Sequence, residues 1–533
     1  MSELSIRILN MSEPLNFALC QSLKPSLVYL TVLAGWRALE MAVDFGKLAL
    51  EEAAKRGASY TDIRISEILN ENLTVKDGEP ETISYSQMRG FGVRVIVCGA
   101  WGFAGSVDIT KDEIRRCIEK AISIAKASAM LKKKDVTLVK EKVYREKYAT
   151  RFKKDPFKVP LEEKLRVLVE VSRFLKEFSP LVNVSYAHYR GYRENKLFMS
   201  SEGAEINQQI TWCGGGISAI AIKGSEVQIR SYPSAFRGDF ATGGYEFFEA
   251  LALTEHAKTV GEELIQLFEA EKCPSGEMDL ILCGDQLALQ IHESCGHPTE
   301  LDRVLGTEAD YAGTSFLTPE KLGRFRYGSE KVNLVADATV PLGLGTFGFD
   351  DEGTKAKKVY LVRRGIFVGY QSSRETAAQL GLKESSGGMR ADSPLALPLI
   401  RMTNINLLPG DYKAEEIIED TSKGVLMMTN RSWSIDDKRI NFQFGAEIGW
   451  LIKNGSREKM IKNPTYMGVT PQFWGSCDAI SKDDWKMWGT PNCGKGVPGQ
   501  VMYVGHGCGT ARFRKVHVGL MGKGGDRGWM LKG

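Results

Sequence analysis

The chain has 533 residues, of which 43% are hydrophobic and 26% are charged, an ordinary mixture for a globular protein. At about 100–200 residues per domain, this length favours two to four domains. The formal net charge of +4 is small for the length, which argues against a nucleic-acid partner. The ten cysteines form no C-x-x-C pair, which favours a reducing compartment. The longest apolar runs fall well short of the roughly 18–20 residues that a membrane span requires.

The two ends of the chain differ in character from the middle. Residues 1–40 fit poorly with the domain pattern of the remaining chain, whereas the segment MAVDFGKLALEEAAKRG from Met41 is typical of a domain that begins with a helix. We therefore predict a poorly ordered extension at 1–40 and a flexible, glycine-rich tail at 519–533.

An N-terminal domain is predicted over residues 41–130. Apolar residues recur at helical spacing over 43–57, and residues 111–128 also have a helical pattern. Between these helices apolar and polar residues alternate, with a hairpin turn at residues 77–78 and a second pair of strands broken at Gly99. The order helix, hairpin, hairpin, helix indicates an α+β unit.

A central domain is predicted over residues 131–270. It begins in a charged stretch, KKKDVTLVKEKVYREKY, and continues with a helix over 161–178. Strand patterns come next at a spacing of roughly ten residues, which predicts an antiparallel meander. A helix at about 246–270 closes the domain.

A C-terminal domain is predicted over residues 271–518, mostly as short strands separated by glycines. The segment MDLILC at 278–283 predicts a strand, and Asp285 is the expected N-cap of the next helix. That helix carries the segment IHESCGH, so a pair of histidines lies near its C-terminal end.

The two histidines of this segment, His292 and His297, are five residues apart, whereas the zinc-peptidase pattern His-Glu-x-x-His places them four apart. Five residues rotate a straight helix by about 500°, which turns the second side chain about 140° away from the first. A π-type turn would bring the side chains back into register. Ending the helix at Gly296, just before Pro298, is the other solution.

The residue types around the histidines fit a catalytic zinc site. Zinc binds histidine nitrogen and cysteine sulfur, and catalytic sites keep a position for water whose proton a carboxylate such as Glu293 can take. Two satisfied polar histidines at a helix end are the competing interpretation, and the commoner one for this pattern in isolation. On chemistry alone, the candidates for a third ligand are Glu300, Asp302, Cys295, Cys493, His506 and Cys508.

Several sequence blocks, in order, resemble the TldD/PmbA metallopeptidases, and specifically their TldD branch. The blocks are GVRVIVCGAWGFAGS, HESCGHPTELDRVLGTEADYAGTSF, FDDEGTKAKKVYLVRRGIFVGY, IRMTNINLLPGD and CGKGVPGQ. The resemblance covers nearly the whole chain from Met41. It implies an α+β fold, with an N-terminal α/β domain of antiparallel hairpins and helices and a C-terminal domain of mixed β-sheet that carries the HExxxH helix.

The resemblance also implies a site and an activity. His292, His297 and Cys493 match the positions of zinc ligands, and Glu293 matches the catalytic base. The implied function is hydrolysis of peptide bonds in unfolded or extended peptides by a zinc-bound water that Glu293 activates. The implied setting is the cytoplasm, in a dimer with a homologous chain that lacks the zinc motif or in a homodimer, without nucleic acid or membrane.

Two further features suit a peptide substrate. The glycine-rich segments at 213–218 and 503–507 would let an extended peptide approach closely as an added strand, although tight sheet packing explains the glycines equally well. Arg390 and Arg401 are candidate substrate-binding residues for a peptide carboxylate or carbonyl, with pairing to local acids as the alternative.

Three other functions rest on single features. A nucleotide-binding oxidoreductase is suggested by the segment GLGTFG at 343–348, which matches the G-x-G-x-x-G fingerprint. Pro341 precedes the segment and no helix is predicted after it, which argues against this function. A hydrolase that uses Cys295 would need a base, and the nearby histidines are assigned to metal. A non-catalytic peptide-binding partner with structural zinc is the main alternative; Glu293 argues against it, because a closed structural site needs no base.

Overall fold

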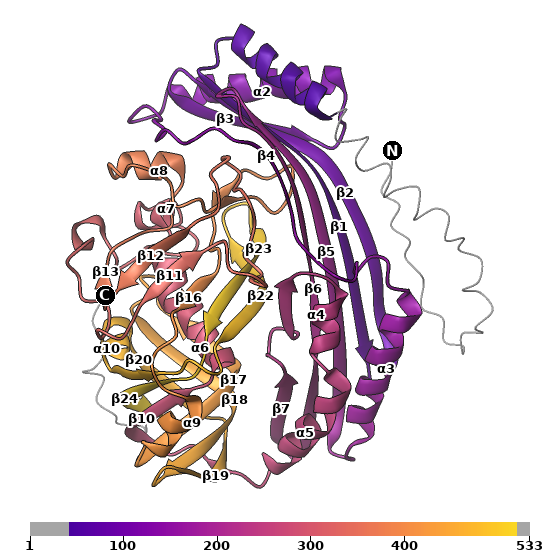
Figure 1. Ribbon diagram of the computed structural model, residues 1–533, viewed down its shortest axis with the longest axis vertical. Helices are drawn as coiled ribbons and strands as arrows, with labels where there is room; N and C mark the ends of the chain where they lie inside the picture. The colour runs from indigo at the N-terminus through magenta and orange to yellow at the C-terminus, as the bar shows by residue number, and fades with distance from the viewer. Residues whose placement is uncertain (1–41, 520–533) are drawn as a thin grey trace.

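The computed structural model describes residues 42–519, so the predictions for residues 1–40 and for the tail beyond Gly519 fall outside it. Two eight-stranded sheets dominate the chain, one in each half, and the long strands of the first run along one flank of the second half (Figure 1). The second sheet contains both parallel and antiparallel pairs. The predicted α+β class, with a mixed C-terminal sheet, is confirmed.

The first sheet has the strand order β3-β2-β1-β5-β6-β4, and β7 and β8 also pair with β6. Helix α2 packs on β2 and β3, whereas α3 and α5 pack on β5 and β6. This half consists of a helix at 42–55, β1 (Tyr60–Lys76), β2 (Glu79–Val97), β3 (Ala100–Ser106), α2 (Lys111–Ala129), β4 (Arg145–Ala149), α3 (Leu161–Glu177), β5 (Val182–Ser200), β6 (Glu205–Lys223), β7 (Glu226–Tyr232), β8 (Asp239–Thr242), α4 (Tyr245–Ala250) and α5 (Leu253–Gln266).

The first hairpin turns where the sequence predicts it. Asp77 and Gly78 have φ angles of 51° and 81°, the pair of positive values that a two-residue hairpin turn requires. The two predicted hairpins are not separate, because β2 runs on through Gly90 to Val97 and pairs with both β1 and β3. A β-carbon at Gly90 would lie 2.7 Å from the carbonyl oxygen of Ser106, so this glycine permits close packing of an extended strand.

One continuous sheet connects the predicted N-terminal and central domains. Strand β1 pairs with β5 over its whole length, from Asp62 opposite Ser200 to Lys76 opposite Tyr186. The antiparallel meander is present, but β5 and β6 are 19 residues long, about twice the expected spacing. The predicted helix at 246–270 is divided into α4 and α5 at Ala252, whose φ is 48°.

The second sheet has the order β17-β10-β24-β20-β18-β19-β9, and an additional β17–β18 pairing closes its middle strands into a ring. This half consists of β9 (Glu271–Lys272), β10 (Gly276–Leu282), α6 (Gly284–Ile291), η2 (His292–Gly296), η3 (His297–Thr299), α7 (Leu301–Val304), η4 (Pro319–Lys321), β11 (Leu334–Asp337), β12 (Lys358–Arg363), β13 (Ile366–Phe367), α8 (Arg374–Gln379), β14 (Met389–Arg390), β15 (Leu399–Ile400), β16 (Ile405–Leu407), α9 (Ala414–Glu419), β17 (Lys423–Ile435), β18 (Asn441–Lys453), β19 (Ser456–Lys462), β20 (Thr465–Val469), α10 (Thr470–Gly475), β21 (Cys477–Ile480), β22 (Lys486–Lys495), β23 (Gln500–Cys508) and β24 (Ala511–Val518).

The two halves meet through buried charges, which we call the interface cluster: Asp62, Arg64, Arg94, Lys196, Asp351 and Glu352. Asp351 pairs with Lys196 at 2.6 Å and with Arg64 at 3.4 Å. Arg94 pairs with Asp62 at 2.6 Å and with Glu352 at 3.5 Å. These ion pairs fix the second half, which carries the histidines, against the first sheet.

Candidate metal centre and active site

The histidine segment comes after β10 and α6, as the sequence predicts. The N-cap of α6 is Cys283 rather than Asp285, which lies inside the first turn. The Asp285 carboxylate instead accepts hydrogen bonds from the Thr429 hydroxyl at 2.7 Å and from the backbone N–H of Gln286 at 2.8 Å. Asp285 therefore ties the helix to strand β17.

A π-helical turn, η2, resolves the five-residue spacing of the histidines. The backbone N–H of His297 donates to the carbonyl oxygen of His292, the i to i+5 bond that restores the register. Gly296 does not end the helix, because its φ of −57° is helical. It is required for space instead, since a β-carbon there would lie 2.3 Å from the sulfur of Met402.

Side chains from elsewhere hold the carbonyls of this turn. Gln371 donates to Gly296 at 2.8 Å, Thr299 to Cys295 at 2.8 Å and Tyr327 to Ser294 at 2.8 Å. These bonds satisfy backbone acceptors near a helix end, where they would otherwise be buried without partners. The turn is thus built into the core as a fixed frame.

Three possible metal-binding side chains converge at this turn. The ligand atoms of His292, His297 and Cys493 all lie within 4.8 Å of one another, and all three residues are buried. Cys493 comes from β22, and its sulfur lies 3.9 Å from Nε2 of His297. Of the six candidates that chemistry alone left open, Cys493 is therefore the one that joins the histidines, the residue that the family resemblance indicates.

Two of the other candidates, Glu300 and His506, contact the Nδ1 atoms of the histidines. Nδ1 of His297 lies 3.0 Å from the carboxylate of Glu300, which can only accept, so Nδ1 carries the proton. Nδ1 of His506 lies 3.4 Å from the carbonyl oxygen of Ile405, so its Nε2 accepts from Nδ1 of His292 at 2.8 Å. With the proton on Nδ1 of both His292 and His297, each Nε2 keeps the lone pair that a metal ion needs.

The charge states suit a metal as well. Burial lowers the pKa of His292 and lowers the pKa of His297 well below the usual value, so both imidazoles are neutral. Burial alone would raise the pKa of the Cys493 thiol, but the charges of Arg401 and His297 reverse this and lower the pKa. The cluster thus offers two neutral nitrogens and a sulfur biased toward thiolate, a donor set that fits zinc.

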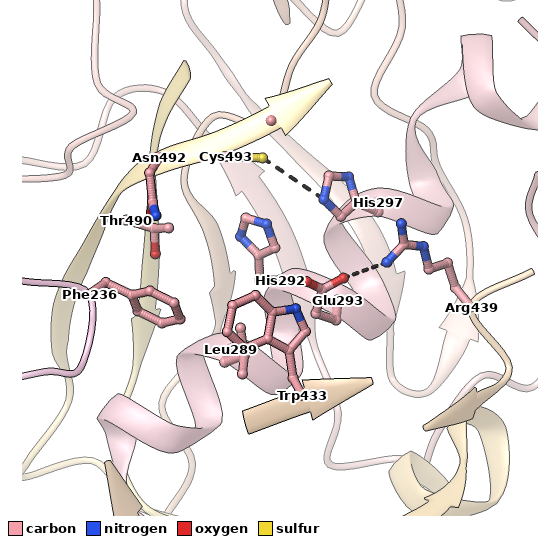
Figure 2. Close-up of a pocket in the computed structure, with 11 residues that line it drawn as sticks. Phe236, Leu289, His292, Glu293, His297, Trp433, Arg439, Thr490, Asn492 and Cys493 are labelled. Carbon is pink, nitrogen blue, oxygen red and sulfur yellow. Dashed lines mark hydrogen bonds and ion pairs between the residues drawn. The ribbon is translucent and has the colours of Figure 1, made fainter. Parts of the chain in front are cut away.

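Glu293 faces a cavity of about 290 Å³ beside these ligands, which we call the metal cavity (Figure 2). Its carboxylate accepts a hydrogen bond from Nη1 of Arg439 at 2.5 Å. The residues that line the metal cavity are Phe236, Leu289, His292, Glu293, His297, Trp433, Arg439, Thr490, Asn492, Cys493 and Gly494.

Seven of the eleven lining residues were not site candidates in the sequence, and three of these seven come from loops and strands far along the chain from the histidine segment. Phe236 comes from the loop between β7 and β8, and its ring lies 5.8 Å from that of Trp433 on β17. Arg439 comes from the β17–β18 loop. No spacing pattern connects these positions, which lie about 200 residues apart in the sequence and are brought together by the fold.

Comparisons with known proteins identify the family. Models of the PmbA/TldA metallopeptidases match the chain at residues 61–125 (domain 1), 154–268 (central domain) and 275–520 (C-terminal domain). A metalloprotease of Methanocaldococcus jannaschii is 33% identical over 458 residues, covering 85% of this chain and 95% of the relative. The chain belongs to the PmbA/TldA metallopeptidase family. The predictions of this family and of a peptidase are confirmed.

More distant proteins are also similar to this chain over nearly its whole length. A protein of Saccharolobus solfataricus named zinc metalloprotease TldD homolog is 23% identical and covers 88% of this chain and 98% of its own length. The solved structure of TldE from Thermococcus kodakarensis has 19% identity and a TM-score of 0.65, covering 91% of this chain and 100% of that one. A Thermotoga maritima structure, solved as a candidate modulator of DNA gyrase, has 17% identity and a TM-score of 0.71, covering 89% and 99%.

The two arginines that the sequence suggests for substrate binding do not line the metal cavity of this PmbA/TldA member. Arg401 is fully buried and donates to the backbone carbonyls of Cys493 and, at 3.2 Å, of Gln500. Arg390 donates to the carbonyls of Met402 and, at 2.9 Å, of Tyr503, and burial lowers its pKa to about 10. Arg401 therefore positions the Cys493 strand.

The glycine-rich segments serve packing between strands. A β-carbon at Gly214 would lie 2.0 Å from the carbonyl oxygen of Asp239, and one at Gly505 would lie 2.2 Å from Oδ1 of Asn404. Strand β6 is paired on both sides at Gly214, to Arg190 and to Phe240, so no edge remains there for a peptide.

The weaker alternatives lose support. In GLGTFG the backbone N–H of Gly345 is bonded to Asn404 at 2.8 Å, and residues 343–355 contain no helix to receive a pyrophosphate. Cys295 is fully buried, and burial raises the pKa of its thiol, which disfavours a nucleophilic role. Along residues 42–519, no helix combines the length and apolar character that crossing a membrane requires.

Proposed function

We propose that this chain is a zinc-dependent peptidase that hydrolyses peptide bonds in extended segments of peptides or unfolded proteins. The observation that carries the proposal is the convergence of His292, His297 and Cys493 on one wall of a cavity that Glu293 also lines. Three protein ligands are the number typical of catalytic zinc, whereas structural zinc takes four. When bound there, zinc would supply Lewis-acid polarisation of a water molecule and of the substrate carbonyl.

The proton transfers fall to Glu293. Its carboxylate accepts a proton from the attacking water as the new C–O bond forms. It returns that proton to the amine nitrogen as the C–N bond breaks, so the carboxylate is regenerated. Arg439 holds one oxygen of Glu293 at 2.5 Å, which orients the group toward the ligands.

An extended substrate suits the walls of the metal cavity. Strand β22 contributes Thr490, Asn492, Cys493 and Gly494, and its pairing with β23 is irregular between Thr490 and Cys493. Extended peptides are recognised through main-chain bonds to such strands, with little dependence on side chains. We further propose, from the family resemblance, a cytoplasmic dimer with a homologous chain or with a second copy.

The test combines zinc content with cleavage in wild type and Glu293→Gln. We expect about one zinc per chain in both proteins, because the amide leaves the three ligands unchanged. Cleavage of an unstructured peptide should fall by roughly 10²–10⁴-fold in the variant, the usual contribution of a general base. Equal cleavage rates would remove Glu293 from the mechanism, and zinc without any cleavage in wild type would favour the non-catalytic peptide-binding partner.

A further inference from the structure

The charge and position of Arg439 are not fully explained by its contact with Glu293. Among the described residues that line the metal cavity, it carries the single permanent positive charge. Its side chain is 14% exposed, and burial lowers its pKa, with the charge of Glu293 acting in the opposite direction. A buried guanidinium of this kind is costly unless something compensates its charge.

The turn that carries Arg439 is built to aim it into the cavity. The residue has a φ of 66°, in the left-handed region, which costs a non-glycine residue about 1–2 kcal/mol. The Asp436 carboxylate accepts the backbone N–H groups of Ile440 at 2.8 Å and Asn441 at 2.9 Å. The Thr470 hydroxyl donates to the Arg439 carbonyl at 2.8 Å. Strain that is held in place from both sides is typical of functional positions.

The guanidinium is only partly satisfied by the chain. Nη1 donates to Glu293, whereas the buried Nε has no hydrogen-bond partner among the described residues. Guanidinium presents five N–H donors in a planar fork that matches a carboxylate in a two-bond arrangement. Among the described residues, Arg439 makes one side-chain hydrogen bond, from Nη1 to Glu293, so the part of the guanidinium that lines the cavity has donors left for a substrate carboxylate.

Part of the metal cavity away from Arg439 is apolar, and Thr490 and Asn492 lie beside that part (Figure 2). Figure 2 shows Arg439 and Phe236 on opposite sides, with His292 and Glu293 between them. Phe236, Leu289 and Trp433 form the apolar part. A peptide whose cleaved bond lies at the ligands would place one neighbouring residue against Arg439, which favours an anionic group, and the other against the apolar residues.

We propose that Arg439 binds a carboxylate of the substrate next to the cleaved bond, which makes the enzyme selective for peptides that present one there. The carboxylate is either the C-terminal α-carboxylate or the side chain of Asp or Glu. This inference rests on the proposed peptidase function. A substrate carboxylate bound by the remaining donors leaves the Nη1 contact with Glu293 in place, so the base keeps its orientation while the substrate is held.

The first experiment measures kcat/KM for matched peptides. One pair is an N-acetylated Phe-Leu-Ala tripeptide as the free acid and as the C-terminal amide. The other pair is an amidated ten-residue unstructured peptide with one internal Glu or with Gln in its place. Wild type should prefer the carboxylate member of at least one pair by about 10- to 100-fold, the range for hydrogen bonds to charged groups.

The variants isolate Arg439. In Arg439→Gln the preference should fall to near unity, whereas Lys438→Gln, which removes an exposed neighbouring charge, should retain it. The acid pair and the Glu pair distinguish the two sources of carboxylate. Equal rates within both pairs in wild type, or a preference unchanged in Arg439→Gln, would overturn the inference.

A binding measurement separates this inference from the peptidase function. Fluorescence anisotropy with N-terminally labelled members of both pairs, on Glu293→Gln and on Glu293→Gln/Arg439→Gln, requires no cleavage. The single variant should bind the carboxylate member of at least one pair about 10- to 100-fold more tightly than its neutral partner, and the double variant should not. If zinc-loaded wild type cleaves nothing while this difference is present, the peptidase proposal fails and the carboxylate site stands. Equal binding of both members in each pair overturns the site.

Discussion

The interface cluster and the metal cavity both contain buried charged and polar groups, but these groups find their partners in different ways. In the interface cluster each charge meets partners from the chain, as Asp351 does with Lys196 at 2.6 Å and Arg64 at 3.4 Å. In the metal cavity the free nitrogens of two histidines and the sulfur of Cys493 face one another, and Arg439 keeps unused donors. The first arrangement pairs each charge with an opposite charge of the chain, whereas the second presents ligand atoms that a metal ion could bind.

This difference teaches how to distinguish structural from functional burial. Both regions are shielded from water, and pKa values shift in each: burial alone would raise the pKa of Asp351, but the charges of Lys196 and Arg64 outweigh burial and lower it, and burial lowers the pKa of His297. Burial and a shifted pKa therefore do not by themselves identify a site. Substitutions in the interface cluster should change stability and leave zinc binding alone, and substitutions around the metal cavity should do the reverse.

The largest expected effect is loss of zinc in Cys493→Ser. A serine hydroxyl stays protonated and replaces a thiolate biased by Arg401, so zinc affinity should fall by at least about 100-fold, beyond the range for outer partners. Elemental analysis should give about one zinc per chain in wild type and little in the variant. Cys98→Ser, at an exposed cysteine, is the control. Full zinc occupancy in Cys493→Ser would mean that the third ligand lies elsewhere.

The next effect is loss of stability in Asp351→Asn. The change leaves buried Arg64 without its charged partner and leaves Lys196 with Glu194 alone at 3.4 Å, which should cost about 3–5 kcal/mol of unfolding free energy in denaturant titration. Zinc per folded chain should not change. Glu146→Gln is the control, because its pair with Lys355 is exposed and worth at most about 1 kcal/mol. A drop in zinc content without a drop in stability would contradict the contrast between the two regions.

The parts of this structure that the sequence predicted are those encoded locally. The turn at Asp77 and Gly78 depends on a few neighbouring residues, and so does the π turn between His292 and His297, which was one of the two solutions that the sequence left open. The resemblance added Cys493, which no local pattern connects to the histidines. The pairing of β1 with β5 depends on contacts more than 100 residues apart in the sequence, beyond the reach of periodicity.

The features that the sequence does not predict depend on the tertiary structure around each residue. The sequence suggests two separate hairpins, but β2 continues through Gly90, and this glycine admits the backbone of Ser106. Arg439 lies in the segment DDKR, which resembles a solvated turn, and only its positive φ and the bonds to Asp436 turn it inward. Side-chain direction at such positions depends on the tertiary structure and not on composition.

The third prediction concerns pH and Asp239, which joins β8 to β22. Burial raises the pKa of Asp239 from 3.8 to about 6, against a partial opposing effect of Lys486. Because the native state holds the proton more tightly than the unfolded state, this group's contribution to stability is present below about pH 4 and is lost as pH rises to about 6. The loss amounts to about 3 kcal/mol at most.

Asp239→Asn tests this directly. Its unfolding free energy relative to wild type should rise between pH 4 and pH 6 and then stay constant, because an amide remains neutral throughout. Asp112→Asn, whose side chain is 96% exposed, should show no such trend. A difference between Asp239→Asn and wild type that does not vary with pH would show that Asp239 is already ionised in the acidic range.

The smallest predicted effect concerns His506, a residue that does not bind the metal itself but contacts one of the proposed ligands. Nε2 of His506 accepts from Nδ1 of His292 at 2.8 Å and thereby keeps the other nitrogen of His292 unprotonated. His506→Phe removes that acceptor, and zinc affinity should fall by about 10–100-fold, the range for partners behind a ligand. His506→Gln retains an acceptor oxygen and should lose less. Competition with a chromogenic chelator measures both, and thermal unfolding checks the fold. If phenylalanine and glutamine weaken zinc equally, the tautomer of His292 is set by some other group, and His506 belongs with the closed packing of the core.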